Sequence, residues 1–151
     1  VSQSTLRAAD PLIVNEHEAR ALLHASAGAD ASATAPGAAM GIPQALAAAR
    51  TLAEGFAASA VVTLGQSGAV AAAGGDAWHE PAPKTDDVVD STGAGDAFVG
   101  ALAACLAFGA NLADAVRCGV AAGTAATGAA GTVASYGRLP RLHPTTPAGT
   151  P

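Results

Sequence analysis

The stretch 90–98, Asp-Ser-Thr-Gly-Ala-Gly-Asp-Ala-Phe, combines carboxylate and hydroxyl side chains with two glycines. It follows the β-branched pair 88–89 and leads into the apolar segment 97–110, an order that predicts a strand, a glycine turn and a helix. The first amides of a helix have no partner within it and lie at the positive end of its dipole, so they favour anions. Glycine at positions 93 and 95 would let the backbone approach such an anion closely.

Asp96 falls in the first turn of this predicted helix, beside the anion that the turn would hold. A carboxylate is a poor ligand for an anion, because like charges repel. It is readily explained as a general base that takes the proton from a hydroxyl group attacking the anion. The stretch therefore favours the transfer of a charged group to an alcohol.

Composition narrows the class of protein. The chain has 151 residues, half of them apolar, which is enough for one domain with a core of Ala, Val and Leu. No apolar run reaches the roughly 20 residues that a membrane helix needs. A net charge of −5 and a single lysine, Lys84, argue against non-specific binding to nucleic acid. We therefore expect no nucleic acid and no membrane as partner.

Several other motifs are missing from the sequence. No Gly-x-x-x-x-Gly-Lys-Ser/Thr occurs, which excludes a P-loop nucleoside triphosphatase, and Phe98 replaces the third glycine of a dinucleotide fingerprint. No spacing of His, Cys, Asp or Glu indicates zinc, and no Gly-x-Ser-x-Gly indicates a hydrolase. Cys105 and Cys118 lie in predicted helices, and we expect free buried thiols in a reducing compartment.

Strands and helices follow one another along the chain, as in an α/β domain. The predicted strands, besides the pair 88–89, are 11–14, 59–64, 69–73 and an edge strand over 77–80. The predicted helices are 19–24, 43–55, 97–110 and 111–127. The segment 25–41 is expected to be a flexible insertion, and the Pro- and Thr-rich tail 138–151 to be disordered.

Three smaller features allow plain structural interpretations. Asn15 and Glu18 have the spacing of a capping box, in which each side chain binds the backbone amide of the other residue. The glycines of 65–68 are consistent with an ordinary hairpin loop, and those of 128–131 with an ordinary turn. From the residues alone, these interpretations remain open.

The stretch 90–98 resembles the C-terminal signature of the ribokinase-like, or pfkB-type, carbohydrate kinase family. The resemblance implies a three-layer α/β/α ribokinase-like fold, of which residues 1–137 would form only the nucleotide-binding half. It implies ATP-dependent phosphorylation of a sugar hydroxyl, with Asp96 as catalytic base. The anion hole would consist of the amides of Gly93, Ala94, Gly95 and Asp96.

The same resemblance makes Asn-x-x-Glu and Thr-Leu-Gly-x-x-Gly nucleotide motifs. Glu18 would organise water around Mg²⁺, and Asn15 would lie near the nucleotide. Val120 stands where ribokinases often have Asn or His near adenine, so it would offer only an apolar contact. The positions implied for ATP are Asn15, Thr63, Leu64, Gly65, Gln66, Ser67, Gly68, Gly95 and Val120.

A monovalent cation, usually K⁺, lies behind the anion hole in many members of this family and orders its amides. In this chain, the resemblance places three of the ligands at backbone carbonyl groups along the segment 126–131. The metal positions implied are Glu18 for Mg²⁺, and Asp90, Thr92, Ala126, Ala129, Gly131 and Ser135 for K⁺.

The sugar is not specified by these motifs, since the family binds it mainly through an N-terminal half and a small β lid. By resemblance, ribose is the first expectation, a sugar phosphate such as fructose 6-phosphate the second, and a nucleoside the third. An alternative of a different class is a truncated fragment that binds nucleotide without turnover. The resemblance further implies a cytoplasmic protein and a possible homodimer through the N-terminal lid.

Overall fold

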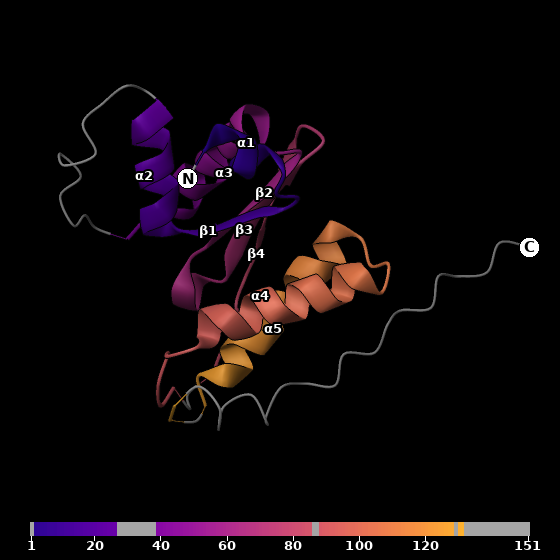
Figure 1. Ribbon diagram of the computed structural model, residues 1–151. Helices are drawn as coiled ribbons and strands as arrows, with labels where there is room; N and C mark the ends of the chain where they lie inside the picture. Colours follow the sequence, from indigo (N-terminus) through magenta and orange to yellow (C-terminus); the bar gives the residue numbers. More distant parts are fainter. Residues whose placement is uncertain (1, 27–38, 86–87, 129, 132–151) are drawn as a thin grey trace, which may run out of the picture. The chain divides into compact units, whose positions relative to one another are not determined.

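The computed structural model describes residues 2–26, 39–85, 88–128 and 130–131 (Figure 1). The chain divides into two compact units, Val1–Pro81 and Ala82–Pro151, and each is described by itself. Most of the insertion predicted for 25–41 and all of the tail predicted for 138–151 lie outside the described residues. Ala129 and Ser135, two of the implied cation positions, lie outside them as well.

The N-terminal unit is built on a four-stranded sheet with the order β1-β2-β3-β4. Strand β1 (Leu12–Asn15) is parallel to β2 (Ser59–Thr63), and β3 (Ala69–Ala73) and β4 (Asp76–Glu80) follow in antiparallel order. The first four residues of β2 and of β3 are buried, as expected for unbroken apolar runs in the middle of a sheet. Strand β4 is only partly buried and lies at the edge, which confirms the predicted edge strand.

Helix α3 (Ile42–Gly55) packs on the sheet through its smallest side chains. Ala45, Ala49 and Leu52 are fully buried and share one apolar core with Val62 and Val70 of the central strands. Alanine at the contact lets the helix backbone approach the sheet closely. A core built from Ala, Val and Leu, as the composition predicts, is therefore present in this unit.

Helix α1 (Gln3–Arg7) precedes β1, and helix α2 (Glu16–Ser26) follows β1. Helix α1 was not predicted from the sequence. It has only five residues, of which Leu6 is buried, so it is too short to show a hydrophobic periodicity. Its local signal is a cap, because the Ser2 hydroxyl oxygen accepts a hydrogen bond from the Thr5 amide at 3.2 Å.

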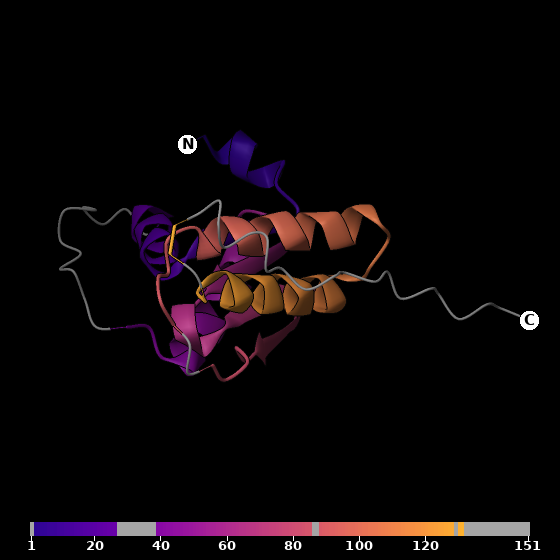
Figure 2. The same cartoon turned by 90° about the horizontal axis from the view of Figure 1, so that it is seen from below.

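The C-terminal unit contains α4 (Ala94–Ala107) and α5 (Leu112–Ala126), which lie side by side (Figure 2). Asn111 caps α5, since its Oδ1 atom accepts a hydrogen bond from the Asp114 amide at 2.9 Å. The helices approach most closely at two glycines of α5. A Cβ atom added to Gly119 would lie 3.0 Å from Phe98, and one added to Gly123 would lie 3.1 Å from the Ala94 carbonyl oxygen.

The strand predicted at 88–89 is wrong. Val88 and Val89 are 62% and 63% exposed, and no strand is assigned to them. The physical reason lies in their hydrogen bonds. The amides of Val89 and Asp90 both donate to the carbonyl oxygen of Thr127, just beyond α5, at 2.8 and 3.2 Å. These two amides therefore donate to a carbonyl oxygen at the end of α5 and are not available to pair with a neighbouring strand.

Cys105 and Cys118 are free, as predicted, although only Cys105 is buried and Cys118 is half-buried. Burial raises the pKa of the Cys105 thiol to about 11, with a further contribution from the hydrogen bond to Cys118. Within the described ranges, no helix has the length and apolar character needed to cross a membrane.

The glycine contact between α4 and α5 can be tested by adding a single methyl group. Gly119→Ala is expected to lower the free energy of unfolding by about 1–3 kcal/mol, because the methyl group would meet the Phe98 ring and carbonyl oxygen. Gly100→Ala on α4 is the matched control. Its added Cβ meets nothing within 4 Å, so the higher helix propensity of alanine should stabilise the chain by up to about 1 kcal/mol. Urea-induced unfolding followed by circular dichroism measures both, and equal shifts would contradict the close contact.

Candidate functional site

The carboxyl ends of β1 and β2 bring two predicted nucleotide motifs together. The strands are parallel, and Asn15 is paired in register with Thr63. The segments that follow them, 16–18 and 64–68, therefore leave the same edge of the sheet. In α/β proteins, ligands bind at the carboxyl ends of parallel strands. The structure thus places Asn-x-x-Glu beside Thr-Leu-Gly-x-x-Gly, although Asn15 and Thr63 lie 48 positions apart in the sequence.

Asn15 and Glu18 form the reciprocal capping box that their spacing predicts. The Oδ1 atom of Asn15 accepts hydrogen bonds from the amides of His17 and Glu18, both at 2.9 Å. The Asn15 amide donates to Oε2 of Glu18 at 2.8 Å. Oε1 of Glu18 takes no part in the box, and the side chain is exposed. The cap therefore leaves one carboxylate oxygen that could order a water molecule.

The turn between β2 and β3 is a single 3₁₀ turn, η2 (Gly65–Ser67). Gly65 and Gly68 have φ angles of +55° and +89°, in the left-handed region that glycine adopts without strain. The Leu64 amide donates to the Gly68 carbonyl oxygen at 2.8 Å, which closes the turn. Leu64 itself belongs to the buried core, so only its backbone is placed to contact a ligand.

The turn before α4 presents fewer free amides than the sequence predicts. Gly93 caps the helix with a φ angle of +83°, and the Ala94 amide donates to the Ser91 carbonyl oxygen at 3.1 Å. The Ala94 amide therefore has its acceptor within the turn. Its predicted role as a free donor in the anion hole is wrong. The amides of Gly95 and Asp96 precede the first intrahelical bond, and both residues are exposed. The Gly93 amide also has no acceptor among the described residues, so three amides of the predicted anion hole, those of Gly93, Gly95 and Asp96, remain for an anion next to the Asp96 carboxylate.

Asp90 ties this turn to the segment after α5. Its Oδ1 atom accepts hydrogen bonds from the Thr92 hydroxyl at 2.7 Å and from the Thr92 amide at 2.9 Å. Its Oδ2 atom accepts a hydrogen bond from the Gly131 amide at 3.1 Å. The hydrogen bonds from Thr92, followed by the one from Gly131, hold the pKa of Asp90 below its ordinary value. Two of the other implied cation positions, Thr92 and Gly131, thus form hydrogen bonds with the carboxylate of the third, Asp90.

The remaining described positions lie on α5. Val120 is 5% exposed and Ala126 is fully buried, so Ala126 offers a ligand only its backbone. No group of three or more His, Cys, Asp or Glu side chains placed to hold a metal ion occurs among the residues that the structure describes.

Sequence reasoning missed the backbone atoms that shape these turns. The carbonyl oxygens of Ser91 and Thr127 accept the amides of Ala94, Val89 and Asp90. A backbone carbonyl has no sequence signature, so only the fold reveals these contacts. His79, which the sequence leaves without a motif, contacts the η2 turn directly.

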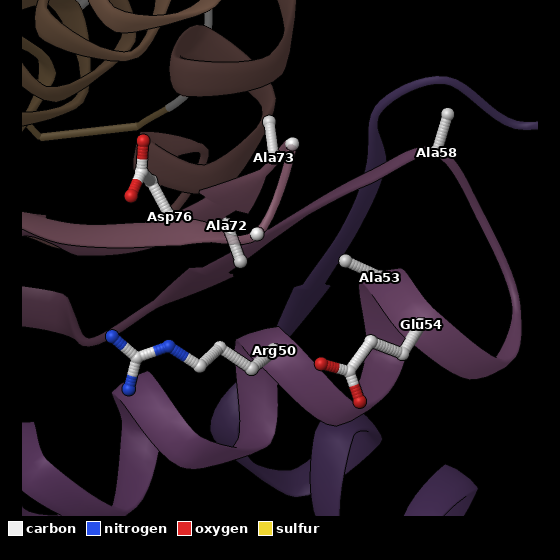
Figure 3. A pocket seen from close by; sticks show the side chains of 9 residues that line it. Arg50, Ala53, Glu54, Ala58, Ala72, Ala73 and Asp76 are labelled. Carbon is white, nitrogen blue, oxygen red and sulfur yellow. The ribbon is translucent and has the colours of Figure 1, made fainter.

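A separate cavity of about 240 Å³ lies near the β3–β4 turn (Figure 3). The lining is mostly small residues, and it includes charged side chains of both signs from Arg50 and Glu54 of α3 and Asp76 of β4. The lining residues are Arg50, Ala53, Glu54, Ala58, Ala72, Ala73, Gly74, Gly75 and Asp76. None of the predicted site residues lines this cavity.

Comparison with known proteins places the chain in a family. Residues 1–137 match the model of the pfkB family of carbohydrate kinases. A ribokinase from Thermotoga maritima has 27% sequence identity and a TM-score of 0.74 over 92% of this chain and 43% of its own. Escherichia coli phosphofructokinase-2, solved with potassium, has 30% identity and a TM-score of 0.63 over 84% of this chain and 36% of its own.

Aminoimidazole riboside kinase from Salmonella enterica, solved with aminoimidazole riboside and an ATP analogue, has 36% identity and a TM-score of 0.53. That match covers 60% of this chain and 32% of the kinase. The chain thus spans less than half the length of each of these kinases. Its mixed α/β structure is that of the ribokinase-like kinases, as the sequence predicts. Since the family model covers residues 1–137, this chain belongs to the pfkB family of carbohydrate kinases.

Proposed function

We propose that the chain is the nucleotide-binding part of a kinase that transfers the γ-phosphoryl group of ATP to a sugar hydroxyl. The observation that carries the proposal is the first turn of α4, where the exposed Asp96 carboxylate stands beside the free amides of Gly93, Gly95 and Asp96. In a carbohydrate kinase family, this arrangement fits an anion hole next to a general base.

The chemistry at this turn is a single displacement. The hydroxyl oxygen of the sugar attacks the γ-phosphorus while the bond to the β,γ-bridging oxygen breaks, and ADP leaves with that oxygen. The hydroxyl proton passes to the Asp96 carboxylate. The three amides stabilise the negative charge on the phosphoryl oxygens, which is the main task in phosphoryl transfer.

ATP is the proposed nucleotide, and the carboxyl edge of β1 and β2 is its proposed support in the N-terminal unit. Asn15 and Thr63 are adjacent there, and the exposed residues of η2 extend from the same edge. The aminoimidazole riboside kinase, with 36% identity to this chain, was solved with an ATP analogue. This match supports ATP as the phosphoryl donor.

Two cations fit the donor atoms available. Mg²⁺ favours oxygen ligands and bound water, and Oε1 of Glu18 is free of the capping box. K⁺ is proposed near Asp90, whose carboxylate oxygens are hard ligands, and phosphofructokinase-2 was solved with potassium. Both cations would neutralise phosphate charge when bound, while Asp90 itself orders the Thr92 and Gly131 amides.

Ribose is the first acceptor to test, because the ribokinase match extends over 92% of the chain. Fructose 6-phosphate is the second, because phosphofructokinase-2 has 30% identity to it. A fragment that binds nucleotide without turnover is the alternative of another class. A cytoplasmic location and a homodimer stay predictions of the family resemblance.

Asp96→Asn separates catalysis from binding. The amide cannot accept the hydroxyl proton, so kcat for sugar phosphorylation should fall by about 10²- to 10⁴-fold, whereas the Kd for Mg²⁺-ATP should change little. Asp114→Asn is the matched control, since Asp114 is the acidic residue in the first turn of α5. It should leave kcat unchanged. Steady-state ADP release and calorimetry measure the two constants, and an Asp96→Asn variant with wild-type kcat would exclude Asp96 as the base.

The three hydrogen bonds to Asp90 predict how the stability of the turn depends on pH. Because its pKa in the folded chain is below the ordinary 3.8, Asp90 stabilises the turn fully above pH 3.8. That contribution is lost as the pH falls through the lowered folded-state pKa. The backbone NMR shifts of Thr92 and Gly131 should therefore titrate with a midpoint below pH 3.8. Asp90→Asn should abolish the titration, and a midpoint at or above 3.8 would contradict the three hydrogen bonds.

A further inference from the structure

His79 of β4 makes a direct hydrogen bond to the turn that the proposed function assigns to the nucleotide. Its Nε2 atom lies 2.7 Å from the carbonyl oxygen of Ser67. A carbonyl oxygen only accepts, so His79 must carry its proton on Nε2 and donate it. His79 is paired in register with Val70 of β3, which places its side chain on the edge strand close to the turn that precedes β3. This residue belongs to none of the motifs that resemble the kinase family.

The hydrogen bond matters because of the peptide group that it holds. The Ser67 carbonyl and the Gly68 amide belong to one planar unit. The Gly68 amide donates to the Gly65 carbonyl oxygen at 3.0 Å, while the Ser67 carbonyl accepts from His79 at 2.7 Å. Both polar ends of this single peptide are therefore fixed.

The Ser67–Gly68 peptide group needs these two hydrogen bonds because Gly68 does not restrict its orientation. Gly68 has φ and ψ angles of +89° and −128°, a conformation that is sparsely populated by residues with a side chain. Since glycine tolerates several backbone conformations, the preceding peptide can rotate at little steric cost. Rotation would break the bond from His79 and the bond to Gly65 together. With His79 in place, the rotated state loses two hydrogen bonds, and without His79 it loses one.

We propose that His79 is a positioning residue of the nucleotide turn, which holds the Ser67–Gly68 peptide in the orientation that receives ATP. The proposal rests on the proposed function, because the nucleotide role of the turn comes from it. His79 acts through the Ser67 carbonyl group and is not assigned a contact with the nucleotide.

Three substitutions separate the hydrogen bond from the bulk of the side chain. His79→Ala removes the donor. His79→Gln places an amide N–H the same number of bonds from Cα as Nε2 of histidine, so it can restore the bond. His79→Asn has an amide of the same kind, but its N–H group corresponds to Nδ1 and falls short of Ser67. The Gln and Asn variants therefore form a matched pair.

The full chain is titrated with Mg²⁺-ATP by calorimetry, and amide exchange is followed by NMR. The Ala and Asn variants should bind Mg²⁺-ATP about threefold to tenfold more weakly and exchange the Gly68 amide faster by a similar factor. The Gln variant should stay within about twofold of the wild type on both readouts. In the wild type, imidazole ¹⁵N spectra should show a protonated Nε2 atom.

Other outcomes would overturn the proposal. They are an Ala variant with the wild-type Kd and wild-type Gly68 exchange, a Gln variant as weak as the Ala variant, or an unprotonated Nε2. If the wild-type chain fails to bind Mg²⁺-ATP, the proposed function of the chain fails. In that case the rate of Gly68 amide exchange, compared between the wild type and the variants without nucleotide, still shows whether His79 holds the peptide group. If the Ala variant fails to fold, the comparison of the Gln and Asn variants decides both readouts.

Discussion

The absence of side chains at Gly119 and Gly123 sets how closely α5 approaches α4, and the shape of the Asp96 turn depends on that approach. At both glycines an added Cβ atom would meet α4 within 3.1 Å, near Phe98 and Ala94. Ala94 is the first residue of α4, two positions before Asp96. The contact therefore supports the start of the helix, where the proposed chemistry takes place.

The end of α5 completes the turn through backbone groups. The Thr127 carbonyl oxygen accepts the amides of Val89 and Asp90, and the Gly131 amide reaches the Asp90 carboxylate. Asp90 in turn holds both polar groups of Thr92. If α5 moved away from α4, these hydrogen bonds would be strained together. The proposed anion hole is thus supported by contacts from the C-terminal end of α5 as well as by its own residues.

The N-terminal unit depends on a different constraint, the parallel pairing of β1 with β2. The register of Asn15 with Thr63 sends two loops from the same edge of the sheet. Each loop is then stabilised locally, one by the capping box between Asn15 and Glu18 and the other by the left-handed glycines 65 and 68. His79 adds a contact from the edge strand to the η2 turn.

Features encoded by neighbouring residues were predictable from the sequence. The capping box spans four positions, and the strands 59–64 and 69–73 are continuous apolar runs joined by a short turn, so each was predicted close to its observed position. The same reasoning failed at Val88 and Val89, because β-branched residues favour a strand only where a partner strand is available.

Long-range backbone contacts explain the other differences. The Asp90 tie joins residues 41 positions apart, and the His79 bond joins residues 12 positions apart. Neither is visible as a pattern in the chain, since one partner in each is a backbone group that every residue possesses. The Ala94 amide was counted as free for the same reason, because its partner is the Ser91 carbonyl oxygen.

We propose that this chain directs the γ-phosphoryl group of ATP to a sugar hydroxyl. The most direct measurement follows that group by ³¹P NMR in a mixture of the chain, Mg²⁺-ATP, K⁺ and either ribose or fructose 6-phosphate. We expect a new phosphate-ester signal of one sugar, growing in step with ADP. Inorganic phosphate growing with ADP, or no loss of ATP with either sugar, would contradict it.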